Sequence, residues 1–184
     1  MSEVFLDAFV KDARLAAAHE DAAFAIRTLL QESMQDKESM AEMIAAKADD
    51  EVMLFEDDSC SIWTCRYSSD VVFSPHEHCM PVHIGVYRGT EVEVLYKREP
   101  GYLRHGGNKH VHAGDVISLG AEAIHAITAD GDIQSHAIHI YQGALTKIER
   151  SLFDWETGEA LAFTMENFYS LKRNKADMAE FNKT

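Results

Sequence analysis

Several features that mark particular classes of protein are scarce in this sequence. Only three of its 184 residues are cysteine, an odd number that does not suggest a disulfide framework. No stretch approaches the roughly 20 apolar residues that a membrane-spanning helix needs. The first residues, from Met1 to Phe5, lack the basic start and apolar run of a secretory signal peptide. We therefore expect a cytoplasmic protein whose cysteines serve packing rather than chemistry.

Positive charge is also scarce. The chain has 17 lysines and arginines against 31 acidic residues, which gives a net charge of -14 and an isoelectric point near 5.0. Such a chain is repelled by nucleic acids and by anionic membranes, so the expected partners are small molecules. Its length and its 46% apolar residues are those of one globular domain with a real core.

Glycine and proline are absent from residues 2–48, where Ala, Glu, Met and Leu dominate. Apolar residues spaced by four predict helices there, and Ser39-Met40-Ala41-Glu42 resembles a capping box that opens a last helix ending near Lys47. We expect residues 1–48 to form a helical extension packed on the rest of the domain.

Short runs rich in Val, Ile, Tyr and Thr follow, broken by Gly, Asp, Asn and Pro. They predict a mainly β barrel over residues 49–145, because strands without intervening helices indicate an antiparallel sandwich or barrel. A helical or irregular tail is expected over 146–184, docked through large apolar side chains. The expected strands are 51–56, 60–67, 82–88, 91–98, 109–112, 115–119, 124–129 and 135–142.

The histidines carry the chemistry of this sequence. His76 and His78 flank Glu77, and alternate residues of a strand point to the same face, so both imidazoles can reach one point. Ser74-Pro75 is expected to halt the preceding element. A later strand can bring His125 to the same place, which outlines a three-histidine metal site. A second pair, His110 and His112, is more simply explained as solvated surface.

The first histidine segment resembles the first motif of the cupin superfamily. His76 and His78 match its two histidines, and Gly89 matches its final glycine. Asp70 stands at its first glycine, and His83 stands where its glutamate is expected.

The second segment resembles the second cupin motif, since Gly114 and His125 match with the right separation. Gly120, Glu122 and Ala129 replace its Pro, Gly and Asn. The resemblance covers residues 51–143 and implies a double-stranded β-helix, or jelly-roll barrel.

A narrower resemblance is to the cysteine dioxygenase branch of thiol dioxygenases. That branch implies iron(II) held by His76, His78 and His125 without a carboxylate. Ala137-Ile138-His139-Ile140-Tyr141 is similar to its Ser-x-His-x-Tyr strand, which implies that His139 and Tyr141 lie beside substrate and dioxygen.

The substrate-binding arginine of that branch is missing from the segment that here reads Asp50-Glu51-Val52-Met53. Arg66, on the strand that leads toward the metal, is the candidate to replace it, with a solvent-facing role as the alternative.

Pro81 can interrupt the alternation of inward and outward side chains after His78, so three roles stay open for His83. They are a fourth metal ligand, a base in the pocket and a packing residue.

We expect a non-haem iron dioxygenase that oxidises a small thiol to a sulfinate. The alternatives are a cupin dioxygenase that cleaves a diketone-like carbon–carbon bond, and a non-catalytic cupin that binds a metal or a small molecule. One divalent transition metal is expected, iron(II) first, with nickel, manganese or zinc as alternatives because imidazole accepts all of them. Assembly into a homo-oligomer is left open.

Overall fold

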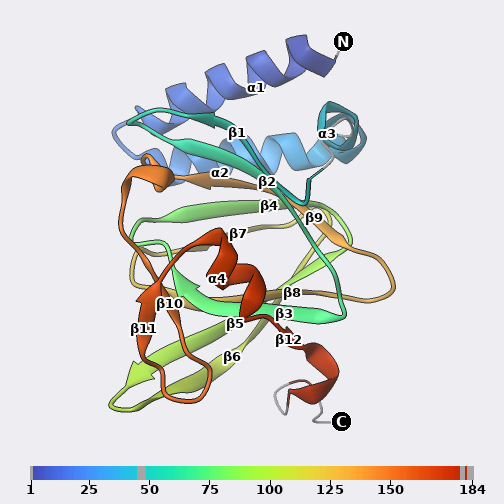
Figure 1. Cartoon of the computed structure of the whole chain (residues 1–184). Helices are drawn as coiled ribbons and strands as arrows, with labels where there is room; N and C mark the ends of the chain where they lie inside the picture. Colours follow the sequence, from blue (N-terminus) through green and yellow to red (C-terminus); the bar gives the residue numbers. More distant parts are fainter. Residues whose placement is uncertain (1, 45–48, 179–180, 182–184) are drawn as a thin grey trace.

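Two antiparallel sheets form a barrel in a computed structural model that describes residues 2–44, 49–178 and 181 (Figure 1). The first sheet has the order β1-β2-β9-β4-β7, and the second has the order β11-β10-β3-β8-β5-β6, with β12 paired to β3. This is a double-stranded β-helix, as predicted. The strands are β1 (Glu51–Glu56), β2 (Ser61–Tyr67), β3 (Val71–Glu77), β4 (Val82–Arg88), β5 (Thr90–Glu99), β6 (Tyr102–His112), β7 (Val116–Leu119), β8 (Ile124–Asp130), β9 (Ser135–Tyr141), β10 (Ser151–Phe153), β11 (Ala160–Ala162) and β12 (Arg173–Asn174).

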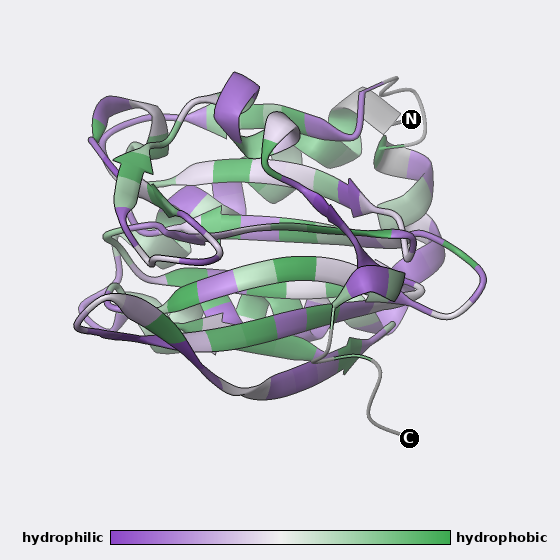
Figure 2. Ribbon diagram, turned by 60° about the horizontal axis from the view of Figure 1, so that its bottom comes forward, coloured by the Kyte–Doolittle hydropathy of each residue, from purple (hydrophilic) through white to green (hydrophobic). Residues whose placement is uncertain are grey.

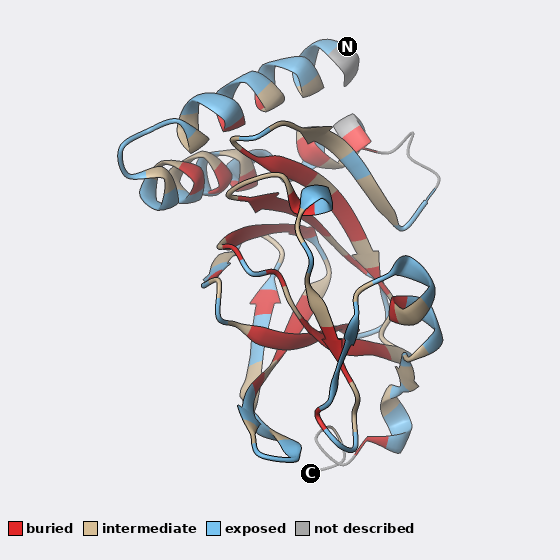
Figure 3. Ribbon diagram, turned by 60° about the vertical axis from the view of Figure 1, so that its left-hand side comes forward, coloured by how far each residue is buried: buried red, intermediate tan, exposed pale blue. Residues whose placement is uncertain are grey.

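The N-terminal helices cover the outer face of the first sheet. They are α1 (Ser2–Ala17), α2 (Ala22–Ser33) and α3 (Lys37–Ile44), with a 3-10 turn η1 (Met34–Asp36) before α3. Ile26 and Leu30 of α2 are fully buried against sheet residues that include Ile138 and Ile140. Figure 3 shows buried positions on the side of α2 that faces the barrel. None of the described helices is long and apolar enough to cross a membrane.

The start of α3 differs from the prediction. The helix begins at Lys37, so Ser39 lies inside it and is not its cap. Asp36 accepts hydrogen bonds from the backbone N–H and hydroxyl of Ser39 at 3.1 and 2.6 Å, and it therefore satisfies the free N–H that a cap serves. The predicted end near Lys47 lies outside the described residues.

A bulge in β3 determines which way the first histidine points. Phe73 pairs with Ile127 and His76 pairs with His125, so three steps on β3 match two on β8. The extra residue falls at Ser74-Pro75, where the ladder can omit a proline N–H. The expectation that Ser74-Pro75 halts the element was therefore wrong. The strand continues, and the bulge turns both Phe73 and His76 inward.

The tail returns along the second sheet. Its β10 pairs with His76 of β3, and β12 pairs with Val71 and Val72 at the other end of the same strand. Its short helix α4 (Met165–Ser170) and two 3-10 turns, η2 (Leu145–Lys147) and η3 (Lys175–Asp177), complete the chain. The apolar residues that we expected to dock are Phe153, Trp155, Phe163, Phe168, Tyr169 and Leu171, and all but Tyr169 pack on buried clusters. Tyr169 is 38% exposed, and its ring makes an edge-to-face contact with the ring of Phe73.

Hydrophobic and hydrophilic residues alternate along the barrel strands, as the colours of several ribbons in Figure 2 show.

Gly89, which joins β4 to β5, has a φ of +69°, and a Cβ there would lie 2.5 Å from the carbonyl oxygen of Gln134. Only glycine fits this turn without a shift of the backbone.

Candidate metal centre

Three histidines meet inside the barrel. His76 and His125 face each other on β3 and β8, and His78 follows just beyond the end of β3. Each offers one ring nitrogen, and these three atoms lie within 4.8 Å of one another. All three side chains are at most 5% exposed. Among the described residues, no other group of three or more potential metal ligands comes together in this way.

The other ring nitrogens of two histidines are already engaged. Nδ1 of His76 lies 2.9 Å from the carbonyl oxygen of Ser74, to which it donates as N–H. Nδ1 of His125 forms a short contact with the buried carboxylate of Glu93. Both contacts fix the ring orientation and leave Nε2 with its lone pair toward the centre. Partners of this kind accompany metal-binding histidines and raise the basicity of the ligand nitrogen.

The spacing of His78 and His125 fits a transition metal. A metal–nitrogen bond is about 2.1 Å, so two imidazole nitrogens at right angles around one ion lie about 3 Å apart. Nε2 of His78 and Nε2 of His125 are 2.9 Å apart. Burial lowers the pKa of His76 and of His78 well below the ordinary value, so both rings are neutral and have lone pairs to donate. Nδ1 of His78 has no hydrogen-bond partner within the described part of the chain.

A small cavity of about 40 Å³ opens beside the rings of His76 and His78. It is walled by aromatic side chains and by both signs of charge, from β1, β2, β3, β9 and the tail. Its lining residues are Glu51, Trp63, Cys65, Tyr67, His76, His78, Tyr141, Leu145, Arg150, Phe163, Met165 and Phe168.

His139 and Tyr141 lie on the inner face of β9, close to this cavity. The Tyr141 ring is 4.9 Å from the His78 ring, and its hydroxyl oxygen is 3.3 Å from Nδ1 of His139. Burial raises the pKa of Tyr141 to about 12, so its hydroxyl keeps its proton at neutral pH. The structure therefore brings these two predicted site residues to the edge of the histidine cluster.

The structure does not bring His83 to the cluster. It sits on β4 opposite Ile140, on the face that packs toward the helices, whereas Ile84 faces the interior. Its Nδ1 lies 2.7 Å from the hydroxyl of Ser118, and its Nε2 accepts from the side-chain amide of Gln142 at 3.0 Å. Pro81 precedes the strand and does not reverse its parity. His83 is therefore a packing residue, not a fourth ligand or a pocket base.

Arg66 is also directed away from the metal centre. Its guanidinium pairs with Asp50 at 3.4 Å and bonds the backbone of Asp49, outside the barrel. Its neighbours on β2, Cys65 and Tyr67, take the inward positions. Because side chains alternate along β2, Arg66 faces outward, which is the alternative that the sequence left open.

Arg150, which follows the last barrel strand, lines the cavity instead. Its guanidinium carbon lies 3.3 Å from the centroid of the Phe163 ring. Burial lowers the pKa of Arg150, but an arginine stays charged in proteins. The sequence did not single it out, because a lone arginine in an irregular tail has no pattern that assigns it.

Glu51 occupies the segment in which an arginine had been sought. It accepts hydrogen bonds from the hydroxyls of Tyr67 at 3.1 Å and Tyr169 at 2.9 Å. Burial raises the pKa of Glu51, although these hydrogen bonds oppose the shift. Tyr169 belongs to α4, so Glu51 ties the tail to the wall of the cavity.

Two buried glutamates were missed by sequence reasoning. Glu91 and Glu93 of β5 are fully buried and point into the barrel. Acidic residues that alternate with Val92 and Val94 on a strand normally indicate a solvent face. Here the tail covers the valine face, where Phe153 packs, so the strand is buried on both sides. Because the tail covers the two valines, the two glutamates face the barrel interior instead of solvent.

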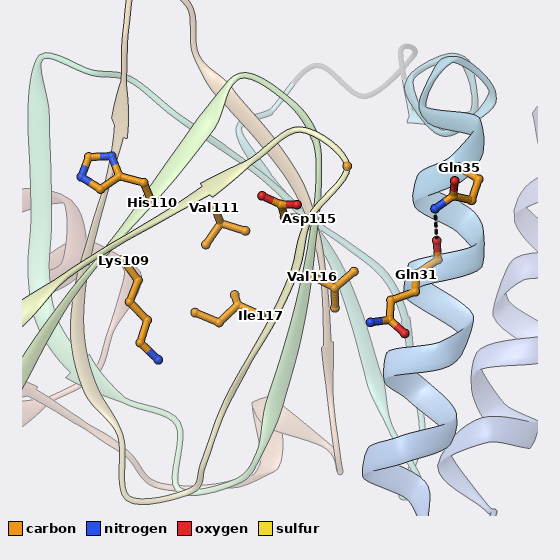
Figure 4. A pocket seen from close by; sticks show the side chains of 9 residues that line it. Gln31, Gln35, Lys109, His110, Val111, Asp115, Val116 and Ile117 are labelled. Carbon is orange, nitrogen blue, oxygen red and sulfur yellow. Dashed lines mark hydrogen bonds between the residues drawn. The ribbon is translucent and has the colours of Figure 1, made fainter.

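A larger hollow of about 710 Å³ lies elsewhere, between α2 and the β6–β7 connection (Figure 4). Gln31, Lys109, His110 and Asp115 are among its lining residues, which include none of the three clustered histidines. His110 pairs with Asp130 at 3.4 Å, and both are about half-exposed. This agrees with the surface assignment of the second histidine pair.

Comparison with known proteins finds similarity to solved structures alone. No protein-family model and no curated protein matches the sequence. Solved structures that resemble the chain include a Bacillus halodurans protein, BH2720 (13% identity, TM-score 0.48, 56% of this chain and 77% of the other). Another is an uncharacterised Klebsiella pneumoniae protein with a double-stranded β-helix domain (13%, 0.45, 60% and 84%). A third is an RmlC-like cupin from Methanocaldococcus jannaschii (12%, 0.44, 55% and 88%).

The contact between Glu93 and His125 leads to a testable prediction. Glu93→Gln keeps the size of the side chain but removes the charge that holds the Nδ1–H of His125. We expect metal affinity to fall about 10- to 100-fold, the usual effect of losing such a partner. Competition with a chromophoric chelator measures this. An affinity equal to that of the unaltered chain would show that Glu93 does not support the ligand.

Proposed function

We propose that this protein is an iron-dependent dioxygenase that oxidises a small thiol bearing an anionic group to the corresponding sulfinate. The observation that carries the proposal is a cavity that two of the three clustered histidines, His76 and His78, line together with Tyr141 and Arg150. Three neutral imidazoles leave the full charge of a divalent ion in place and leave positions open for an anionic thiolate and dioxygen. Bound iron(II) would supply the redox chemistry of the reaction.

The overall reaction balances without another reductant. One thiol and one dioxygen give one sulfinic acid, in which both oxygen atoms are bonded to sulfur and the thiol proton is kept on oxygen. The chain must therefore bind one small organic substrate, orient it and exclude water, with no second cofactor. The aromatic walls of the cavity suit the exclusion of water.

Arg150 supplies the positive charge that would hold the substrate's anionic end. Its guanidinium presents several N–H donors to a carboxylate and is supported by the face of Phe163. Glu51 lines the same cavity, and burial raises its pKa toward the neutral form, which limits its repulsion of an anion. A thiol with a carboxylate a few bonds from sulfur fits this arrangement best.

Tyr141 stands between the metal ligands and His139, with its proton retained. In this proposal its hydroxyl donates a hydrogen bond to the reacting groups in the cavity, and the contact with His139 supports that orientation.

The test is oxygen uptake after anaerobic loading with iron(II). A panel should contain small thiols with and without a carboxylate, and diketones of similar size. We expect uptake with carboxylate thiols and little with neutral thiols. Uptake with diketones alone would favour carbon–carbon cleavage. Full metal occupancy without uptake on any compound would favour a binding protein and would overturn the proposal.

A further inference from the structure

The second buried carboxylate of β5, that of Glu91, is not a partner of the three clustered histidines described above. Glu91 is fully buried, and neither of its oxygens has a hydrogen-bond partner within the described residues. An isolated carboxylate in a barrel interior is costly, so it requires a nearby positive or donating group. The group that meets it is His139, whose Nε2 lies 3.4 Å from Oε1 of Glu91.

This contact crosses the barrel from one sheet to the other. Glu91 belongs to the second sheet, while His139 lies at the middle of the first, paired with Trp63 and Ile84 on its neighbouring strands. On the far side of the ring, Nδ1 lies 3.3 Å from the hydroxyl oxygen of Tyr141. Tyr141 in turn contacts His78. A continuous series of polar groups thus runs from Glu91 to the histidine cavity.

The two glutamates of β5 serve two different imidazoles. Glu93 contacts His125, a predicted metal ligand, and Glu91 contacts His139, which is outside the ligand set. In this sequence Ala137 has no side-chain group to bond His139. Glu91 approaches the ring from the opposite sheet and supplies an acceptor there.

We propose that Glu91 is a positioning residue that, acting through His139, aims the hydroxyl hydrogen of Tyr141 into the cavity. With both ring nitrogens protonated, Nε2–H of His139 donates to Glu91 and Nδ1–H donates to the oxygen of Tyr141. The tyrosine hydrogen is then free to point at a bound substrate. This role rests on the proposed function, because it matters only if chemistry occurs in the cavity.

The groups around His139 favour the protonated, positively charged form of its ring. Burial lowers its pKa, but nearby Cys65, Tyr141 and Glu91 outweigh burial and raise the pKa of His139 well above the ordinary value. Burial raises the pKa of Glu91 and the contact with His139 opposes that shift, so each of the two groups favours the charged form of the other. The other titratable groups that interact with His139 or Glu91 include Glu51, Tyr67, His76, His78, Glu93 and His125.

The first test does not depend on activity. In the full chain with zinc in place of iron, nitrogen NMR of labelled histidine reports which ring nitrogens carry protons. We expect both nitrogens of His139 to be protonated near neutral pH, and one to lose its proton in Glu91→Gln. His139→Asn identifies the signal by removing it. An unchanged His139 signal in Glu91→Gln would overturn the proposal even if no substrate were ever found.

The second test is a double-mutant cycle on the iron-loaded protein. Hydrogen-bond donors of this kind contribute on the order of 100-fold to the rate. We expect Glu91→Gln to lower kcat about 10-fold, with little change in KM or in metal affinity. In a Tyr141→Phe background the same change should have no further effect, because the residue through which it acts is gone.

The outcomes separate this role from a structural one. Equal losses from Glu91→Gln with and without Tyr141 would mean that Glu91 supports the fold alone. A loss of metal affinity like that expected for Glu93→Gln would mean that it acts on the ligands. No turnover in the unaltered protein would refute the proposed function, while the NMR result would still decide how Glu91 and His139 are arranged.

Discussion

His125→Ala is expected to abolish metal binding. The variant removes one of three ligands and leaves Glu93 as a buried carboxylate without its partner. Loss of a supporting partner alone costs about 10- to 100-fold in affinity, so loss of the ligand itself should exceed ~100-fold. Metal analysis after dialysis should find close to one ion per chain in the unaltered protein and only traces in the variant. Oxygen uptake should disappear with the metal.

His83→Ala is the matched control. It also removes a buried histidine, but from the face of β4 that packs toward the helices, where Ser118 and Gln142 are its partners. We expect full metal content and near-normal turnover, with some loss of stability from the cavity. Equal metal loss in both variants would indicate a general effect of removing a core histidine. A fully loaded His125→Ala variant would refute the ligand assignment.

Arg150→Gln is expected to weaken the binding of carboxylate thiols strongly. A hydrogen bond to a charged group contributes about 1.5 to 3 kcal/mol, which corresponds to roughly a 10- to 150-fold rise in KM. Neutral thiols should lose little, because they do not use the guanidinium. Steady-state oxygen uptake with paired substrates that differ only in the carboxylate measures the difference.

Arg66→Gln is the control for charge. It removes the same charge from the neighbouring outer surface, where Arg66 pairs with Asp50. We expect its KM values to match those of the unaltered protein. If Arg150→Gln affected neutral and anionic thiols equally, Arg150 would be part of the wall rather than the anion site.

The fold and the three clustered histidines could be predicted because sequence patterns mark them. Alternation along strands placed His76 and His78 together, and the resemblance to the second cupin motif singled out His125. Helical periodicity in residues 2–44 was equally informative. Strand alternation and helical periodicity depend on neighbours in sequence, so a single chain reveals them.

The rest of the site depends on contacts between distant segments. Glu91 and Glu93 are buried because the tail packs on the other face of β5, and Arg150 reaches the cavity from an irregular segment. His83 kept ordinary strand parity despite Pro81, whereas the bulge at Ser74-Pro75 changed parity in β3. Sequence patterns locate proline but do not tell which proline alters a register.

The most direct test of the proposed dioxygenase is turnover of a carboxylate thiol by the iron-loaded protein under isotopically labelled dioxygen. Mass spectrometry of the product then counts the oxygen atoms that reach sulfur. The proposal predicts a sulfinate with two labelled oxygens and one dioxygen consumed per thiol. A disulfide as the main product, or a sulfur product whose oxygens come from water, would contradict it.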